Sequence, residues 1–595
     1  MDRTIETMLR RMVHYPWLRP VSVAEPTGAV AVGAVAFEGR LDRALATHPD
    51  GRLTVVLDGE LFDADAEWRR LGTTGAQWTS RCHAALVGAG WDAEGPAFLA
   101  RLNGEFSALI WDRVKGELHA VTDRFGLRPL YVATPAGSFA AATELTPLLE
   151  LPGVDRSWSE MGVSQFFSFG YFFNDDTLLR GVRALPAATC GTFRVAGGDY
   201  REQRYWRLRR GLVSGSADDL GAAFEDRFVA AVERRALPGE RLGLSLSGGL
   251  DARTILGVMP AGRDLQSVSI GIDGSLDHKS ATQLAALAGV PHHSFMLEQS
   301  FLTEFERHLR EMVGLTDGLY LDQGIVMPTM PLYRQLGIEH LMRGHGGELL
   351  HMTKAYAFSL DSQALSATAP ALEAWLLDHM SSYMLSGVPS DLFRVDLRAG
   401  AAASLRRALE ACEPADRPVD QVWQLFLDQR IHRETTLSMH TFGCFAGVRQ
   451  PYLDNDVIDV LFSMPASMKL ADELQTRLLR HKRPSFLNVT NSNTGARMGA
   501  GTIENTLARI RLKVGAKLGW KGYQPYERLG LWLRRELREF VQSVLSRPAF
   551  LESGLFNPDA VRRVVDQHLA DQANHTFLLM SLIIFALGQE ARDAR

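Results

Sequence analysis

Residues 241–253, RLGLSLSGGLDAR, join an apolar run, a turn of small residues and a carboxylate in an order that suits phosphate binding. The run 242–246 predicts a buried strand, 247–249 a tight turn, and 252–259 a helix. A helix N-terminus presents unpaired backbone N–H groups and a partial positive charge, so it can cradle a phosphate. Asp251 stands where a carboxylate can hold a magnesium ion between phosphates. The Walker lysine pattern is absent from this turn, and an ordinary strand–turn–helix corner is the alternative.

A second stretch, Ile338–Leu350, places a histidine and a carboxylate in another glycine-rich loop. Glu348 can ligate magnesium, although its side chain is longer than that of aspartate. Histidine titrates near neutral pH, so His345 can accept a proton from an attacking amine. The alternative is a turn in which His345 only hydrogen-bonds the backbone. The adjacent His292 and His293 point to opposite faces of an extended segment, which favours a structural role over metal binding.

Alternating strand and helix patterns surround these two loops. Residues 215–236 and 280–288 predict helices, and residues 266–272 predict a strand. This alternation predicts a parallel, doubly wound sheet, which binds nucleotides at the carboxyl ends of its strands. Residues 352–418 are helical by pattern, and the basic residues of 507–521 are typical of a solvated helix face.

The first third of the chain has a different pattern, because short apolar runs there follow one another with glycines between them. Such runs predict the strands of a mainly antiparallel region. Asp58-Gly59 and Asn103-Gly104 predict turns. The apolar runs are 29–37, 53–57, 106–111, 118–122 and 130–133.

Composition sets broad limits. A chain of 595 residues is expected to form more than one domain. Hydrophobic residues at 46%, charged residues at 22% and a net charge of −5 are typical of a soluble globular protein and give no reason to expect nucleic acid as a partner.

The 4 cysteines form no CxxC pair, which indicates neither a zinc site nor a disulfide framework and favours a cytoplasmic location. The N-terminus lacks a signal core, and the apolar run 577–587 is too short for a membrane span, so we expect a buried helix there.

Several motifs resemble, in the same order, those of the asparagine synthetase family. SGGLDA at 247–252 resembles the family's pyrophosphate-binding loop, and residues 433–465 resemble a segment in which Arg449, Pro451 and Asp454 match. The resemblance implies a fold of α/β and α+β class with two domains. Residues 1–208 would form an antiparallel β sandwich flanked by helices, of the Ntn glutaminase type, and residues 209–595 a doubly wound parallel sheet of the adenine nucleotide α-hydrolase type with added helices. The N-terminal motifs are LDGELFD (57–63), LNGEFSALIWD (102–112), TDRFGLRPLYVA (122–133) and AATELTPLLE (141–150).

The chain departs from this family at residues that glutamine hydrolysis needs. The family's nucleophile is an N-terminal cysteine, whereas this sequence begins Met1-Asp2-Arg3 and its first cysteine is Cys82. Where the family has Asn-Gly to stabilise an oxyanion, this chain has Asp58-Gly59, whose carboxylate carries the wrong charge. We therefore expect an inactive glutaminase domain. In the pyrophosphate loop, Arg253 follows Ala252 where the family has serines, and its guanidinium is a candidate phosphate contact.

The resemblance implies ATP and Mg²⁺ as cofactors. Asp251 and Glu348 are the expected metal ligands, and Asp317 resembles an acidic position near the substrate, with a solvated helix cap as the alternative. Contacts to ATP or pyrophosphate are expected from Leu246, Ser247, Gly248, Gly249, Asp251, Ala252, Ser269, Ile270, Gly271, Gly344 and Gly346.

Two residues are the expected catalytic groups. His345 stands where the family has a catalytic glutamate. The family's transition-state lysine has no counterpart in NSNTGARMGAG (491–501), where Arg497 is the candidate replacement and Lys482 the alternative.

The chemistry that the resemblance implies is ATP-dependent amide formation. A carboxylate attacks the α-phosphorus of ATP, pyrophosphate leaves, and an amine displaces AMP from the acyl-adenylate. Two branches of the family, β-lactam synthetases and lasso-peptide cyclases, lack the N-terminal cysteine and use an amine within the substrate. The length of the chain and its additional helical sequence favour a lasso-peptide cyclase, which closes a macrolactam between a peptide's N-terminal amine and an Asp or Glu side chain.

Three alternatives stay open: a β-lactam synthetase, an ammonia-using amide synthetase, and a scaffold that binds ATP without catalysis. A cyclase implies a leader-cleaved precursor peptide as substrate. It also implies a leader peptidase and a leader-recognition protein as partners.

Overall fold

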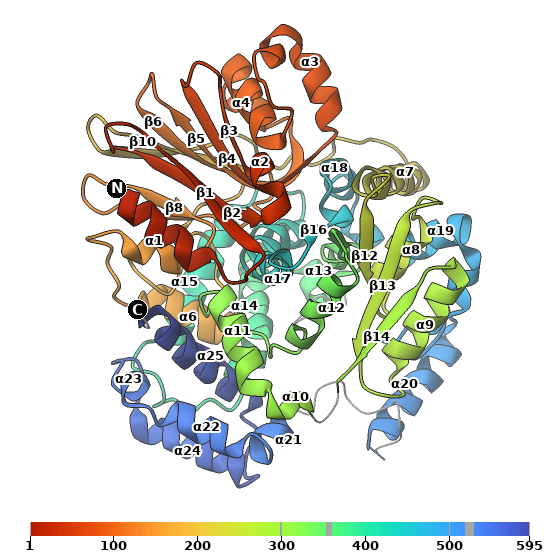
Figure 1. The fold of residues 1–595 in the computed structure, drawn as a ribbon. Coiled ribbons are helices and arrows are strands. Elements are labelled where there is room, and N and C mark those ends of the chain that lie inside the picture. Colours follow the sequence, from red (N-terminus) through yellow and green to blue (C-terminus); the bar gives the residue numbers. More distant parts are fainter. Residues whose placement is uncertain (1, 298–299, 353–359, 499, 518–528, 594–595) are drawn as a thin grey trace.

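The chain folds around two sheets of different kinds, one in each half of the sequence (Figure 1). The computed structural model describes residues 2–297, 300–352, 360–498, 500–517 and 529–593. The N-terminal sheet is antiparallel and the C-terminal sheet is parallel, so the mixed fold class expected from the sequence is confirmed. The proposed domain boundary between residues 208 and 209 lies in the segment that joins the two halves.

The main N-terminal sheet has 6 strands, and its neighbours in space are mostly neighbours in sequence. Each apolar run predicted in this region contains a strand. The sheet order is β11 (Asp199–Arg204), β10 (Thr189–Arg194), β6 (Glu117–Thr122), β5 (Asn103–Asp112), β4 (Leu53–Phe62) and β3 (Leu45–Thr47). Smaller antiparallel sheets pair β1 (Leu18–Ala24) with β2 (Ala31–Phe37), and β8 (Ala140–Ala142) and β9 (Arg183–Ala184) with β7 (Tyr131–Ala133). The flanking helices are α1 (Asp2–Met12), α2 (Leu41–Ala44), α3 (Ala64–Ala76), α4 (His83–Glu94), α5 (Pro96–Leu99) and α6 (Glu160–Phe169).

The turns predicted at Asp58-Gly59 and Asn103-Gly104 are wrong, because both pairs lie inside β4 and β5. Gly59 pairs with Phe106 in the antiparallel ladder and has a φ of 116°. A Cβ added at Gly59 would lie 2.0 Å from the main-chain oxygen of Glu105. Glycine is therefore needed there for a close approach between strands and not for a chain reversal.

The C-terminal sheet has 5 parallel strands, in the order β14 (His292–Met296), β13 (Asp264–Gly271), β12 (Arg241–Ser245), β15 (His340–Met342) and β16 (Gly447–Arg449). From β12, the first of these strands in the sequence, the chain adds β13 and β14 on one side and then β15 and β16 on the other. The direction of winding therefore reverses between β12 and β15, and such sheets bind ligands at the carboxyl ends of the strands at this point. The helices α8 (Asp251–Gly257) and α9 (Leu276–Ala288) follow β12 and β13, as the sequence predicts.

Most of the remaining C-terminal half is helical. The predicted buried helix at 577–587 lies within α25 (Thr576–Asp593), which packs beside α11 at the blue end of the chain in Figure 1. Residues 353–359 of the predicted helical region and residues 518–521 of the predicted basic helix lie outside the described residues. No helix in the described ranges is long and apolar enough to cross a membrane. The helices include α7 (Ala217–Arg235), α11 (Phe305–Leu315), α12 (Met330–Gln335), α13 (Ser362–Ser366), α14 (Ala369–Leu385), α15 (Leu397–Glu410), α16 (Gln421–Leu425), the π-helix η7 (Phe426–Thr435), α17 (Thr436–Gly443), α18 (Asn455–Leu461), α19 (Glu473–Lys482), α20 (Thr502–Lys517), α21 (Leu529–Arg534), α22 (Arg538–Leu545) and α24 (Pro558–Leu569).

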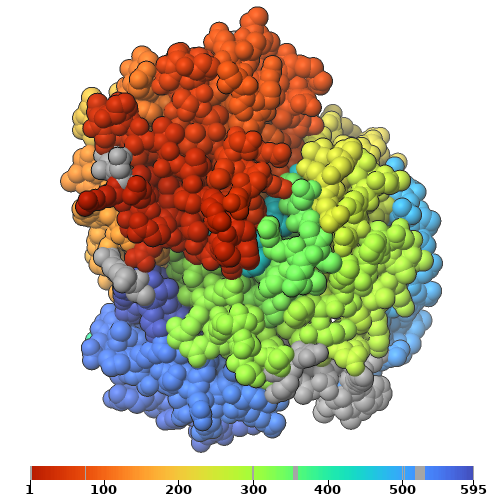
Figure 2. All heavy atoms as spheres, viewed as in Figure 1, coloured from red at the N-terminus to blue at the C-terminus, as the bar shows by residue number. Residues whose placement is uncertain are grey.

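The two halves are packed directly against each other, as Figure 2 shows, and buried ion pairs join them. The Arg235 guanidinium on α7 donates to Asp454 Oδ2 at 2.6 Å and lies 3.3 Å from Oε1 of Glu105 on β5. Asn103, also on β5, donates from Nδ2 to Asp454 Oδ2 at 3.0 Å. The Arg235 and Asp454 side chains are fully buried, so loss of one partner would leave a buried charge unpaired.

Candidate active site

Two loops meet at the carboxyl edge of the parallel sheet, where the strand order reverses. One loop, 246–250, follows β12 and leads into α8, and the other, 343–350, follows β15. The strands β12 and β15 are adjacent and parallel, with Leu242 opposite His340, so both loops leave the same edge of the sheet. The topology therefore brings together the two stretches that the sequence singled out.

Asp251 is the residue on which the two loops converge. Its Oδ1 accepts hydrogen bonds from Gln475 Nε2 at 2.8 Å and from His351 Nε2 at 3.1 Å. The buried Tyr452 hydroxyl donates to the Asp251 main-chain oxygen at 3.1 Å and accepts from Gln475 Nε2 at 2.8 Å. Three separate segments of the chain thus fix the position of one carboxylate.

Glycines allow the second loop to approach Asp251. A Cβ added at Gly347 would lie 2.2 Å from Asp251 Oδ1, and one added at Gly344 would lie 2.8 Å from Asp251 Cβ. Gly346 has a φ of 90°, and an added Cβ would lie 2.7 Å from Leu453 Cδ2. These positions require glycine for packing, and the contact of Gly344 and Gly346 with ATP stays a prediction.

Glu348 is the second carboxylate at this edge. Its Oε2 accepts a hydrogen bond from the Gly346 N–H at 2.9 Å. Burial, followed by the negative charge of Asp251, raises the pKa of Glu348 above its usual value. Two carboxylates that repel each other in a buried site are suitable donors for a divalent cation.

This donor set fits magnesium bound together with phosphates. Mg²⁺ typically takes one or two carboxylates and completes its shell with water and phosphate oxygens. Within the described part of the chain, no group of three or more His, Cys, Asp and Glu side chains is placed to hold a metal ion. In a site of this kind Asp251 and Glu348 would supply the two carboxylates.

One amide of the phosphate loop donates to a carboxylate of the chain itself. The Gly248 N–H donates to Oδ1 of Asp277 at 3.1 Å, and the Gly249 N–H donates to Ser247 Oγ at 3.1 Å. Asp277 lies in the first turn of α9. The Gly248 amide is thus oriented toward an oxyanion, which is the property expected of a phosphate cradle.

The expected adenine-side residues lie on the neighbouring strand. Ser269, Ile270 and Gly271 end β13, directly beside β12. The Ser269 hydroxyl bonds His292 Nε2 at 3.1 Å, and the other nitrogen of that ring bonds Ser267 Oγ at 2.9 Å. His292 therefore links β14 to β13, which is the structural role that the sequence favoured.

The prediction that Arg253 contacts phosphate is wrong. Its side chain is fully buried, and burial lowers its pKa to about 10. The guanidinium donates to main-chain oxygens of Val489 at 2.8 Å, Thr490 at 2.8 Å and Gly248 at 2.9 Å. Arg253 thus ties the phosphate loop to the segment after α19, and sequence reasoning missed this role because the partners are carbonyls far along the chain.

His345 lies half-buried in the second loop, close to Glu348 in sequence. Burial, followed by the charges of Arg343 and Arg430, lowers the pKa of His345 to about 3. The expected titration near neutral pH is therefore contradicted, and the imidazole is neutral at pH 7. Its action as a base stays a prediction.

The catalytic roles of Arg497 and Lys482 stay predictions. Arg497 is exposed, and its Nε lies 3.1 Å from Oε1 of Glu504 in α20. Lys482 is the exposed last residue of α19.

Asp317 has a different role from the expected one. It is buried, and its carboxylate accepts hydrogen bonds from the main-chain N–H groups of Leu145 at 2.5 Å and Thr146 at 3.1 Å. It caps the 3-10 helix at 146–150 of the N-terminal half from across the domain contact. The alternative of a solvated cap is wrong too, because the cap is buried.

Three of the 4 cysteines, all of them among the described residues, are buried, whereas Cys82 is half-buried. Cys82 accepts a hydrogen bond as the N-cap of α4. Burial raises the pKa of Cys190 to about 11 and of Cys412 to about 12, and raises that of Cys444 well above its usual value. Such thiols stay protonated at neutral pH and are poor nucleophiles.

Sequence reasoning missed the residues that position Asp251. Gln475, His351 and Tyr452 lie between 100 and 224 residues away along the chain. His351 directly follows the second loop, and Tyr452 directly follows Pro451 of a motif already singled out, so motif analysis could have found both. Gln475 lies in a segment whose periodicity indicates only a helix.

Two protein-family models match the chain, "Glutamine amidotransferase domain" over residues 44–206 and "Asparagine synthase" over residues 223–482. Asparagine synthetase (glutamine-hydrolyzing) 3 of Bacillus subtilis (strain 168) is 23% identical over 309 residues, which cover 49% of this chain and 50% of that protein. A putative asparagine synthetase (glutamine-hydrolyzing) of Mycobacterium bovis is 31% identical over 215 residues, 35% of this chain and 33% of that protein. The chain thus matches half or less of the length of these relatives. A solved structure described as the allosteric regulatory enzyme of purine biosynthesis covers 49% of this chain and 77% of its own, with 11% identity and a TM-score of 0.26.

Proposed function

The chain carries both domains of the asparagine synthetase family, and on that premise we propose that it is an ATP-dependent, AMP-forming amide ligase. One observation carries the proposal: Asp251 and Glu348 converge beside the phosphate loop at the edge where the parallel sheet changes its winding. Carboxylates and loop amides at such an edge suit a magnesium-bound nucleoside triphosphate.

Several side chains have a role in this proposal. Asp251 and Glu348 hold magnesium, which neutralises charge on the phosphate oxygens when bound. Gln475 and Tyr452 keep the Asp251 carboxylate in place. His345 is the candidate base for the attacking amine. Its pKa of about 3 makes the imidazole a weak proton acceptor, and negative charge on bound phosphates would strengthen it.

The amine in this reaction comes from the substrate or from free ammonia. The cysteines of the N-terminal half, Cys82 and Cys190, lie inside the chain and bring no α-amine of their own as a base, and Asp58 stands where a neutral amide would stabilise an oxyanion. A carboxylate and an amine of the same molecule would then close a ring.

Within this class, macrolactam formation in a lasso peptide is the activity that we favour. The support is the helical sequence between the second loop and β16, which is large enough to enclose a peptide, together with the absence of a glutaminase nucleophile. We infer a leader-cleaved precursor as substrate, a leader peptidase and a leader-recognition protein as partners, and a reducing cytoplasm as the location. A β-lactam synthetase or an ammonia-using amide synthetase is the second candidate, favoured by the same site.

The test is to incubate the protein with magnesium-ATP and a leader-free precursor peptide encoded beside its gene. Mass spectrometry should show loss of one water from the peptide, and chromatography should show AMP in equal amount. Asp251→Asn should abolish both. Asp226→Asn, which changes an exposed aspartate on α7, is the matched control and should leave both unchanged.

The outcomes separate the candidates. AMP formed with free ammonia or a small amino acid, and not with the peptide, would favour a small-molecule synthetase. Unchanged AMP formation by Asp251→Asn would remove the magnesium assignment. No AMP with any of these substrates would favour a scaffold that binds ATP without catalysis.

A further inference from the structure

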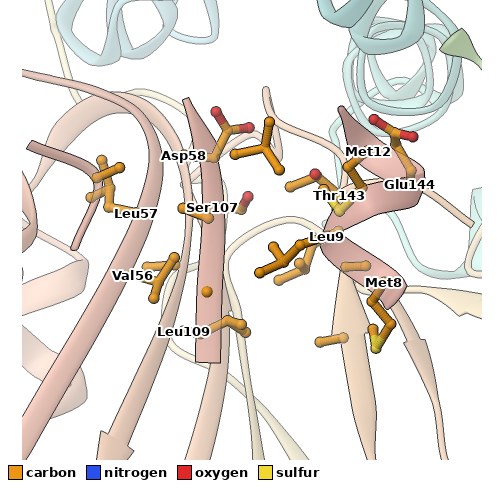
Figure 3. A pocket seen from close by; sticks show the side chains of 18 of the residues that line it. Met8, Leu9, Met12, Val56, Leu57, Asp58, Ser107, Leu109, Thr143 and Glu144 are labelled. Atoms are coloured by element: carbon orange, nitrogen blue, oxygen red, sulfur yellow. The ribbon is translucent and has the colours of Figure 1, made fainter. Parts of the chain in front are cut away.

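A cavity of about 710 Å³ lies between the N-terminal half and residues of α17 and β16 in the C-terminal half, and neither Asp251 nor Glu348 lines it (Figure 3). Alternate residues of β4 and β5 form one of its walls: Val56 pairs with Leu109, and Asp58 pairs with Ser107, in the antiparallel ladder. Side chains that alternate along paired strands share one face, so these four residues face the cavity together. The helix α1 and strand β2 contribute the opposite wall.

The cavity is amphipathic along its length. Met8, Leu109 and Val56 lie at one end in Figure 3, and the carboxylates of Asp58 and Glu144 lie at the other. A ligand that fills such a space needs an apolar body and one polar head group. Its volume is in the range typical of small-molecule sites, about 300 to 1,000 Å³.

The two carboxylates differ in their partners. Glu144 accepts hydrogen bonds on both oxygens, from His14 Nε2 at 2.8 Å and from His440 Nε2 at 3.2 Å. Among the described residues, no hydrogen bond or ion pair reaches the half-buried carboxylate of Asp58. Arg40, Arg43 and Arg128 also line the cavity, but among the described residues no ion pair within 4.0 Å joins any of them to Asp58. The Arg128 guanidinium is directed at main-chain oxygens. Asp58 is therefore the group at the polar end that lacks a donor.

A carboxylate without a partner at the edge of an apolar cavity is costly, and a charged donor offsets that cost best. We propose that this cavity binds a small amphipathic molecule with an apolar body and a primary ammonium head, and that Asp58 accepts the head's hydrogen bonds. The cavity is thereby a ligand-binding site distinct from Asp251 and Glu348 of the proposed amide ligase.

The experiment compares three probes with the same ten-carbon chain and different heads: decylamine, decanol and decanoic acid. Calorimetry on the full-length protein without ATP, below the micelle concentration of each probe, should show decylamine binding at least about tenfold more tightly than decanol, as expected for a charge-assisted hydrogen bond. Decanoic acid should bind more weakly than decylamine, because its ionised head offers Asp58 no hydrogen-bond donor.

Two variants test the residues. Asp58→Asn should weaken decylamine about tenfold and leave decanol unchanged, whereas Met8→Trp, which fills the apolar end, should weaken both. Asp42→Asn, an exposed aspartate on α2, is the matched control, and thermal melting shows that each variant is folded. The proposal is overturned if folded wild-type protein does not bind decylamine, if decanol binds as tightly as decylamine, or if Asp58→Asn leaves decylamine binding unchanged.

Discussion

Arg449 of β16 holds Glu60 of β4 through two hydrogen bonds, Nε to Oε2 at 2.7 Å and a terminal nitrogen to Oε1 at 3.1 Å. The same guanidinium pairs with Glu240, which precedes β12. Burial alone would raise the pKa of Glu60, but the charges of Arg449 and His340 hold it well below its usual range. One arginine of a motif shared with amide ligases thus joins the parallel sheet to the N-terminal sheet.

We expect Glu60→Gln to lower the free energy of unfolding by about 3 kcal/mol, because it removes one charge of a buried pair. Urea titration followed by circular dichroism measures the change. Glu160→Gln, at a side chain that is 73% exposed, is the control and should change the free energy by less than about 0.5 kcal/mol. Equal effects of the two substitutions would show that the buried pair contributes no net stability.

Gly347→Ala should abolish AMP formation while the protein stays folded. The added methyl would lie 2.2 Å from Asp251 Oδ1, so the loop and the carboxylate cannot both keep their positions. Gly314→Ala, on α11, is the control, since an added Cβ there meets no atom within 4 Å. The two variants are compared by AMP release under saturating ATP, and normal activity of Gly347→Ala would mean that the loop moves away from Asp251 during turnover.

Arg253→Met should loosen the phosphate loop without removing a phosphate ligand. The substitution leaves the main-chain oxygens of Gly248, Val489 and Thr490 without their donor, so we expect a loss of about 2 kcal/mol in unfolding free energy and a higher KM for ATP. Arg227→Met, on the exposed side of α7, serves as the comparison. A variant with lower kcat and unchanged KM and stability would contradict this positioning role.

Lys469 predicts a pH dependence of stability. Burial lowers its pKa from 10.5 to about 7, its Nζ donates to the Leu461 main-chain oxygen at 2.7 Å, and the ring of Trp423 lies beside it. The unfolded chain therefore binds this proton more tightly than the folded chain between pH 7 and pH 10.5. The free-energy cost of burying the Lys469 ammonium is absent above pH 10.5 and grows as the pH falls toward about 7. The free energy of unfolding should therefore rise with pH between these two values.

Substitution isolates that effect from other titrations. Lys469→Met should reduce the slope of unfolding free energy against pH by up to about 1.4 kcal/mol per pH unit between pH 7 and pH 10. Guanidinium titrations at intervals of one pH unit provide the slopes, and Lys482→Met, at an exposed lysine, should match the wild type. An unchanged slope in Lys469→Met would show that the lysine reaches water in solution.

Local sequence patterns predicted β12, β13, the strand before the second loop and both loops, but not β14 or β16. The run before Ser247 and the glycines around His345 carry their own strand and turn signals, and their meeting follows from the strand order. The same local rules failed at Asp58-Gly59. A glycine inside a strand and a glycine in a hairpin turn look alike in sequence, and only the close approach of Glu105 distinguishes them.

Side-chain partners were beyond the reach of sequence patterns. Arg253 was assigned to phosphate from its position after the loop, yet its donors reach carbonyls more than 230 residues away. Asp317 was placed near a substrate by motif, and its carboxylate caps a helix in the other half of the chain. Long-range contacts of this kind depend on how helices pack across domains, which periodicity does not encode.

The cluster of Asn103, Glu105, Arg235 and Asp454 also limits how this protein can exchange parts with its relatives. Two of its members come from the N-terminal sheet and two from the C-terminal half. A chimera that combines the N-terminal half of this protein with the C-terminal half of a divergent homologue keeps only two of the four side chains. If the homologue lacks the matching residues, a buried charge is left without a partner. Chimeras should therefore fold only when the two parent proteins together supply all four side chains, so the two halves cannot be exchanged freely between relatives.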